Sequence, residues 1–90
     1  MSLPDKRDRI NHRAPPLLWR QVYADLLSDI HSGVLADDDR LPSEFEMAEQ
    51  YGVSRDVIRR AKEELAGEGW LIVLQGRGTF VAHPEPGDSN

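Results

Sequence analysis

The stretch between Gly52 and Leu65 limits the possible folds most, because it reads as a tight turn followed by a two-faced helix. Glycine supplies a backbone conformation that most residues avoid, so Gly52 is suited to such a turn. The apolar residues beyond it recur at helical spacing, at Val57, Ile58, Ala61 and Leu65. A stripe of this kind must pack against another element, so the helix cannot stand alone.

The other face of this helix, predicted over residues 54–68, carries positive charge. Arg55, Arg59 and Lys62 follow one another at i, i+4 and i+7 and share a face, with Arg60 beside them. Ser54 stands at the start, where its hydroxyl can accept from a free backbone N–H of the first turn. A helix with one buried face and one cationic face fits a DNA recognition helix. Taken alone, the stretch fits a solvated surface helix equally well.

A first helix is predicted to begin near Leu17, after prolines 15 and 16, and to stop at Gly33. Six apolar side chains recur with the spacing of a helix that packs on a core: Trp19, Val22, Tyr23, Leu26, Leu27 and Ile30. Aspartates 37–39 follow. They lack the alternating ligands, central glycine and distal glutamate of a calcium loop, so we expect a solvated loop.

A second helix is predicted up to Tyr51, ending at Gly52. It should begin at a capping box, in which Ser43 bonds forward to a backbone N–H and Glu46 reaches back. Three of its residues are candidates for burial: Phe45, Met47 and Ala48. This helix, the turn and the helix over 54–68 together have the dimensions of a helix-turn-helix.

The chain after Gly69 predicts a β-hairpin. Residues 70–74 are β-branched, aromatic or leucine, and residues 79–82 form a second candidate strand. Glycines 76 and 78 suit the turn between them, which exposes Arg77 near its tip. The predicted fold is therefore mostly α with a small β-hairpin wing: three helices plus a two-stranded antiparallel sheet over residues 17–82. Residues 1–16 are expected to be a disordered basic arm and residues 83–90 a flexible tail.

Charge is distributed unevenly along the chain. The net charge of −5 by itself disfavours a nucleic-acid partner. Residues 1–20 carry a local +3 and residues 54–82 a local +1, whereas residues 21–53 carry −7. Such an asymmetry is compatible with one DNA-facing side, and it predicts modest non-specific binding.

Composition argues against several other classes. There is no cysteine for a disulfide or thiolate site, and the three histidines are too dispersed for a metal site, so we expect no enzyme, metal or cofactor. No apolar run approaches a membrane span and no signal peptide is recognised, so we expect a cytoplasmic protein without membrane contact. A winged-helix protein-interaction adaptor is the main alternative, since fold does not fix function. It predicts a neutral or acidic face on the helix over 54–68.

An ordered set of short motifs resembles the winged helix-turn-helix domain of the GntR family, from about Leu17 to Val81. The motifs are Leu41-Pro42-Ser43-Glu44, Met47-Ala48, Gly52-Val53-Ser54-Arg55, Glu68-Gly69 and Gly76-Arg77-Gly78-Thr79-Phe80-Val81. The resemblance implies a bacterial transcription regulator, expected to be a repressor, that binds a palindromic double-stranded DNA operator as a homodimer. The sequence from Tyr51 to Arg55 most resembles the HutC-like branch of the family. Family members usually continue into an effector-binding domain, which we do not expect within these 90 residues.

The resemblance also implies where DNA would be contacted. The helix over 54–68 would enter the major groove and the wing over 75–79 the minor groove. The candidate DNA-binding residues are Ser43, Ser54, Arg55, Asp56, Arg59, Arg60, Lys62, Gln75, Gly76 and Arg77. The role of Asp56 is left open: it could accept a hydrogen bond from a cytosine amino group, orient a neighbouring arginine, or stabilise the helix N-terminus. Phe45 stands where many members have an arginine, so that contact is expected to be lost.

Overall fold

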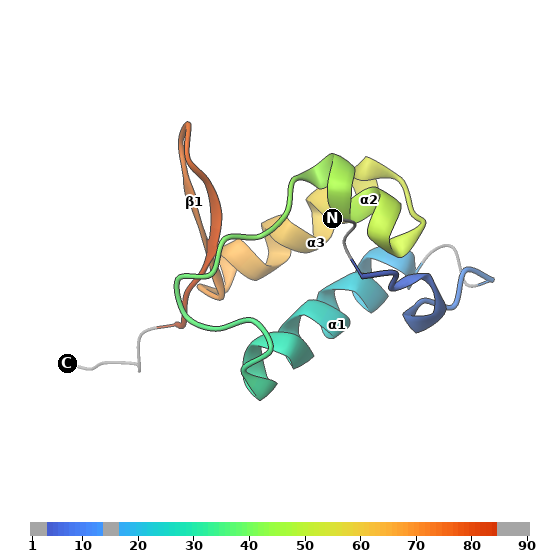
Figure 1. Ribbon diagram of the computed structural model, residues 1–90, viewed down its shortest axis with the longest axis horizontal. Helices are drawn as coiled ribbons and strands as arrows, with labels where there is room; N and C mark the ends of the chain where they lie inside the picture. The colour runs from blue at the N-terminus through green and yellow to red at the C-terminus, as the bar shows by residue number, and fades with distance from the viewer. Residues whose placement is uncertain (1–3, 14–16, 85–90) are drawn as a thin grey trace.

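The computed structural model describes residues 4–13 and 17–84, and Figure 1 shows how their elements are arranged. Within those ranges the elements are a short 3-10 helix η1, three α-helices and two strands. Their bounds are η1 Arg7–Arg9, α1 Leu18–Ser32, α2 Glu44–Tyr51, α3 Arg55–Gly67, β1 Leu71–Leu74 and β2 Gly78–Val81. The strands pair antiparallel, so the predicted fold class is confirmed.

The core forms where the apolar stripes of the helices meet. α1 lies against α3, α2 packs on α3, and the base of the hairpin closes one end (Figure 1). Among the described residues the buried apolar cluster comprises Ile10, Val22, Leu26, Ile30, Leu41, Met47, Ala48, Tyr51, Ile58, Ala61, Leu65, Leu71 and Val81. Burying this surface fixes the position of α3, whose opposite face is left to solvent.

Local hydrogen bonds set the ends of α2 and the start of α3. The Ser43 hydroxyl accepts from the Glu46 N–H at 3.1 Å, and the Glu46 carboxylate accepts from the Ser43 N–H at 2.9 Å, so the capping box is confirmed. α2 stops at Gly52, which adopts a left-handed φ of 68°. Ser54 then caps α3 by accepting from the Val57 N–H at 3.2 Å. The turn of the helix-turn-helix is thus specified by residues next to it in sequence.

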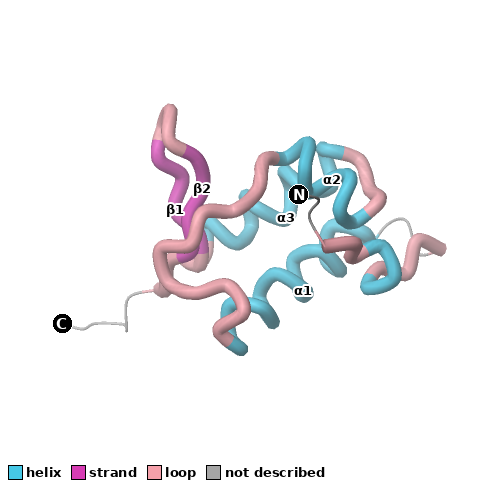
Figure 2. The backbone as a smooth tube through the Cα atoms, in the orientation of Figure 1, coloured by secondary structure: helices cyan, strands magenta, loops and turns pink. Residues whose placement is uncertain are grey.

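The hairpin projects from the helices and carries the turn at its far end (Figure 2). Leu71 pairs with Val81 and Leu74 with Gly78. The segment leading into α2 joins the sheet by an isolated bridge from Arg40 to Phe80. The Leu41 N–H adds a hydrogen bond to a β2 carbonyl at 2.8 Å. The wing is therefore tied to the start of α2 as well as to the end of α3.

One burial prediction is wrong. Phe45 was a candidate for the core, yet 56% of it is exposed. The buried face of α2 runs through Met47, Gln50 and Tyr51, at i, i+3 and i+4. Phe45 lies two residues before Met47, which places it about 200° around the helix and out in solvent.

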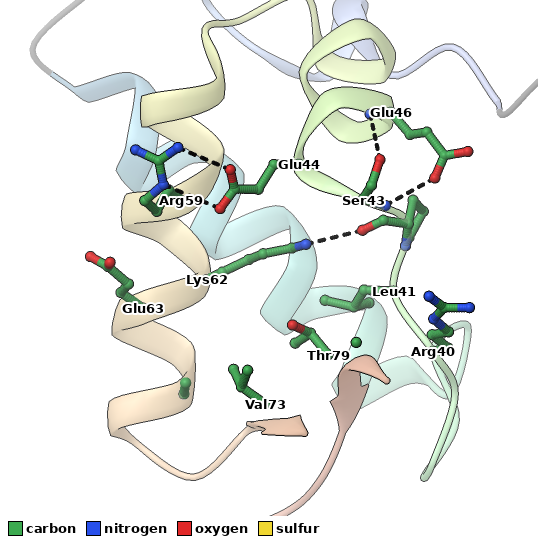
Figure 3. A pocket seen from close by; sticks show the side chains of 13 residues that line it. Arg40, Leu41, Ser43, Glu44, Glu46, Arg59, Lys62, Glu63, Val73 and Thr79 are labelled. Carbon is green, nitrogen blue, oxygen red and sulfur yellow. Dashed lines mark hydrogen bonds and ion pairs between the residues drawn. The ribbon is translucent and has the colours of Figure 1, made fainter. Parts of the chain in front are cut away.

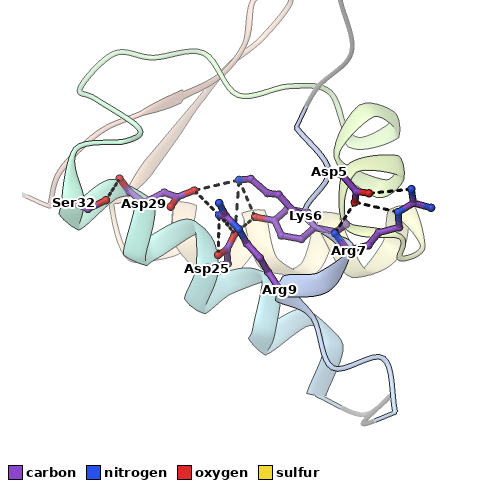
Figure 4. Close-up of polar contacts among 8 residues, drawn as sticks. Asp5, Lys6, Arg7, Arg9, Asp25, Asp29 and Ser32 are labelled. Carbon is purple, nitrogen blue, oxygen red and sulfur yellow. Dashed lines mark hydrogen bonds and ion pairs between the residues drawn. The ribbon is translucent and has the colours of Figure 1, made fainter.

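The N-terminal segment differs from the disordered arm that the sequence predicts. Residues 4–13 pack against α1 and α2, and Ile10 is only 5% exposed. Lys6 reaches Asp29 at 3.2 Å, and Arg9 reaches Asp25 at 3.2 Å (Figure 4). An apolar anchor and paired charges thus order a segment whose composition alone suggests disorder. Residues 1–3, 14–16 and 85–90, and with them most of the predicted flexible tail, lie outside the described residues.

Tyr51 joins this ionic cluster from the end of α2. Its ring is fully buried, its phenol donates to Asp25, and Lys6 donates to the phenol oxygen at 3.3 Å. Burial raises the pKa of the Tyr51 phenol far above its usual range, and the hydrogen bond to Asp25 adds to the rise. Tyr51 therefore stays neutral and acts as a fixed hydrogen-bonding link between α1, α2 and the N-terminal segment.

Substituting Ile10→Ala tests whether the N-terminal segment belongs to the folded unit. Because Ile10 is buried, we expect the free energy of unfolding to fall by about 2 kcal/mol or more. Ile72→Ala is the matched control, since 49% of Ile72 is exposed on the hairpin, and it should change stability by about 0.5 kcal/mol or less. Urea denaturation followed by circular dichroism measures both. Equal midpoints for the two variants would show that residues 4–13 are not packed.

Candidate nucleic-acid interface

The exposed face of α3 brings together four of the residues predicted as a site. Ile58, Ala61 and Leu65 turn inward and are fully buried, which leaves the face with Arg55 and Arg59 in solvent. Ser54 and Asp56 lie at the start of the same helix and are exposed. A chain of net charge −5 thus presents cations at one helix N-terminus, where backbone N–H groups already favour an anion.

A glutamate from α2 holds the two arginines of this face. Glu44 accepts from Arg59 through both carboxylate oxygens, at 3.2 and 3.1 Å (Figure 3). Glu44 also lies 3.9 Å from the Arg55 guanidinium. Asp56 accepts from Arg59 at 2.8 Å, so in this structure the aspartate orients the arginine. The hydrogen bonds that Arg59 donates to Glu44 are the main cause of the raised pKa of Arg59. Ion pairs of an arginine exposed to solvent contribute little to stability, so another anion can replace these carboxylates.

A groove of about 740 Å³ separates α3 from the hairpin, and residues 40–46 form its third wall. Lys62 extends into it and donates to the Pro42 carbonyl at 3.0 Å (Figure 3). Burial lowers the pKa of Lys62, although the nearby carboxylates of Glu44 and Glu46 oppose the shift. This candidate DNA-binding residue is therefore a half-buried amine inside the groove rather than a freely exposed one.

Arg60 lies apart from the other predicted residues. Its guanidinium stacks over the Trp19 ring at 4.3 Å and pairs with Glu64 at 3.1 Å. Trp19, predicted as part of the core stripe, is half-buried beneath this cation. The structure thus places Arg60 on the side of α3 that faces α1, away from the groove that Lys62 enters.

The hairpin turn presents the three predicted wing residues together. Gln75, Gly76 and Arg77 are all exposed, and Arg77 closes the turn by donating its N–H to the Leu74 carbonyl at 2.9 Å. Gly76 has a φ of 76°, a conformation that disfavours a side chain even though the space beside it is open. The remaining predicted residue, Ser43, lies at the mouth of the groove and caps α2.

Arg40 and Glu44 are site residues that the sequence reasoning did not single out. Arg40 lines the groove beside Gly78, where an added Cβ would lie 2.8 Å from the Arg40 Nε. Within residues 4–13 and 17–84, no ion pair holds Arg40 or Arg77. Arg40 could have been found from its position directly before Leu41-Pro42. The three aspartates that precede it make the local net charge negative, so the segment did not read as cationic. Glu44 was attributed only to a family motif.

Two other kinds of site were sought in the described ranges. No group of three His, Asp or Glu side chains there is placed to hold a metal ion. Among the helices described, none combines the length and apolarity needed to cross a membrane.

Lys62→Met should stabilise the protein near neutral pH. Burial lowers the folded-state pKa of Lys62 below its unfolded value, so the folded chain binds fewer protons and gains stability as pH rises between these two values. The advantage of the methionine variant should therefore shrink as pH rises through this interval. Urea denaturation at pH 7 and again above pH 10 measures the difference. An advantage that is absent at pH 7, or that grows with pH, would contradict a desolvated amine.

Comparison with known proteins agrees with this arrangement. The histidine utilization repressor of Klebsiella aerogenes is 49% identical over 72 residues, which cover 80% of this chain and 30% of the relative. The HTH-type transcriptional repressor NagR of Bacillus subtilis is 45% identical over 76 residues, covering 84% of this chain and 31% of the relative. The chain thus spans less than a third of the length of either protein.

A solved structure shows the same fold. The crystal structure of the AraR DNA-binding domain in complex with an operator matches with a TM-score of 0.68 and 42% identity, covering 71% of this chain and 77% of that one. The family model described as bacterial regulatory proteins of the gntR family matches residues 18–81. The resemblance noted in the sequence is confirmed, and the chain belongs to the GntR family of bacterial regulatory proteins.

Proposed function

We propose that this chain binds double-stranded DNA in a sequence-specific manner and represses transcription. The observation that carries the proposal is the exposed N-terminal face of α3. Within the described residues, Arg55 and Arg59 are held there by the carboxylates of Glu44 and Asp56, which another anion can replace. Proteins similar to it are named as transcriptional repressors, and a similar DNA-binding domain is seen in complex with an operator. No catalytic role is part of the proposal, and the site of action is the bacterial cytoplasm.

α3 enters the major groove with its N-terminal end toward the base edges. An arginine that pairs through two hydrogen bonds with guanine discriminates against other bases by about 1–3 kcal/mol. Arg55 and Arg59 supply such forks, while Ser54 lies where a phosphate can approach the helix N-terminus. Arg55 and Arg59 leave Glu44 and Asp56 as DNA binds. The loss of these ion pairs is a free-energy cost that the contacts to the bases must offset.

The wing enters the neighbouring minor groove of the DNA. The DNA backbone that separates the major from the minor groove then lies in the protein groove between α3 and the hairpin. Arg77 supplies charge at the wing tip, and Gly76 lets the backbone of the turn approach closely. Arg40 and Lys62 line the groove and contact phosphates, which set the register without reading sequence. Lys62 exchanges its backbone acceptor for a phosphate and thereby recovers the charge interaction that burial weakens.

Two copies of the chain act together on a palindromic operator. A single module of this size buries about 600–1,000 Å² on DNA, which is small for high affinity. Two linked half-sites convert the second binding event into a local one and raise the overall affinity. The two-fold symmetry of such a homodimer matches the two-fold symmetry of a palindrome.

Selection from a random duplex library at moderate salt, followed by salt titration of the selected duplex, tests the function. We expect a short palindrome whose affinity falls steeply with salt, because phosphate contacts release counterions. A second selection with an artificially dimerised form of the chain separates weak dimerisation from lack of recognition. Failure of both forms to enrich any sequence would favour a protein-interaction adaptor.

Arg55→Ala should abolish the preference for the selected duplex while leaving the melting temperature nearly unchanged. The reason is that 60% of the Arg55 side chain is exposed and its one anionic contact in the described residues is 3.9 Å long. Arg60→Ala is the matched control from the same helix and should retain the preference. Competition binding against a scrambled duplex, with a thermal melt of each variant, measures both effects. A large loss of stability in Arg55→Ala would mean that the residue is structural.

A further inference from the structure

The packed N-terminal segment lies outside the part of the chain that matches the family model. That match begins at residue 18, whereas residues 4–13 are described here and contribute Ile10 to the core. Figure 1 shows this segment at the end of the α2–α3 unit that is opposite to the hairpin. This element therefore adds to the part of the chain that the family model describes.

This segment runs directly over the turn between α2 and α3. The Lys6 N–H donates to the Gln50 carbonyl at 2.8 Å, and the His12 ring nitrogen lies 3.0 Å from the Tyr51 carbonyl. Arg7 covers Gly52 so closely that an added Cβ there would lie 2.7 Å from the Arg7 Cγ. Gly52 is two residues before the cap of α3, so Arg7 lies beside the entry to the recognition helix.

The charges of this segment are used in two different ways. Lys6 is 11% exposed and is committed to Asp29 and Asp25, and Arg9 pairs with the same two carboxylates. Arg7, in contrast, has a side chain that is 65% exposed (Figure 4). Lys6 and Arg9 anchor the segment to α1, whereas Arg7 lies on the outside, where a partner from solution can reach it.

Among the described residues, the anionic partner of Arg7 is Asp5, which is itself 63% exposed. The carboxylate accepts from the guanidinium at 3.1 and 3.2 Å, the two-pronged geometry that a phosphate also offers. An exposed pair between neighbours in sequence contributes little to stability. Asp5 therefore occupies the place of a phosphate at small cost and can be displaced by one.

We propose that residues 4–13 form a second phosphate-binding element, in which Arg7 contacts the DNA backbone on the side of the major groove opposite to the wing. The proposal rests on the proposed function. A major groove is about 12 Å wide and is bounded by two backbones. The protein groove beside α3 receives one of these two DNA backbones, and Arg7, at the other end of the helix-turn-helix, contacts the second.

The test uses the 90-residue chain with Arg7→Gln and Asp5→Asn, and Arg13→Gln as control. Arg13 is an exposed cation of the same segment, six residues after Arg7. The probes are the duplex from the selection above and an unrelated 24-base-pair duplex, titrated from about 50 to 200 mM salt. Fluorescence anisotropy gives the affinity and the salt slope, and a thermal melt verifies folding.

Arg7→Gln should weaken binding to both duplexes by a similar factor and reduce the salt slope by about 1, as the loss of one phosphate contact requires. Asp5→Asn should act in the opposite direction and strengthen binding, because it frees Arg7. Arg13→Gln should change the slope less than Arg7→Gln. All three variants should melt like the unsubstituted chain, since these side chains are exposed.

Two results would overturn the inference while leaving the proposed function intact. In one, the unsubstituted chain selects an operator, but Arg7→Gln binds that operator with the same affinity and the same salt slope as the unsubstituted chain. The other is an equal effect of Arg7→Gln and Arg13→Gln, which would indicate diffuse charge. An unsubstituted chain that binds neither duplex would overturn the inference together with the proposed function.

Discussion

The buried phenol of Tyr51 is the contact on which the arrangement of the other elements depends. It ends α2, donates to Asp25 of α1 and accepts from Lys6 of the N-terminal segment. An unpaired buried hydroxyl is costly, so the three elements must stay in register for this group to be satisfied. The next residue, Gly52, turns the chain into α3. The direction of α3 is thus set by a neutral phenol that is held between a carboxylate and an ammonium group.

The sequence predicted the helices, the capping box and the hairpin because each has a local signal. Ser43 and Glu46 are three residues apart, and Gly52 and Gly76 adopt the positive φ that their turns require. The N-terminal segment was missed because its order depends on distant partners, the core around Ile10 and the carboxylates of α1. The same limit explains Phe45, since periodicity defines a stripe only after the neighbouring helix is placed.

The sequence predicted which residues of α3 share a face, but it did not predict which partners they have. The sequence grouped Arg55, Arg59, Arg60 and Lys62 as one cationic surface. In the structure Glu44 holds both Arg55 and Arg59, whereas Arg60 pairs with Glu64 and Lys62 donates to the Pro42 carbonyl. Spacing on a helix determines which side chains share a face, but it does not determine which anions approach from elsewhere. Glu44 arrives from α2, so its hold on Arg59 could not be predicted from α3 alone. Electrostatic selectivity here depends on which of these internal pairs DNA can replace.

The bridge between Arg40 and Phe80 makes the wing and the start of α2 one mechanical unit. A hairpin attached only through the end of α3 could swing to follow grooves of different width. Here the Leu41 N–H also bonds to β2, so the wing cannot tilt without carrying the helix-turn-helix with it. In the proposed mode of binding, the span between the DNA groove that α3 would read and the groove that the wing would enter is then a fixed length. A half-site with one base pair inserted between them would be out of phase with the protein, however well each part matched.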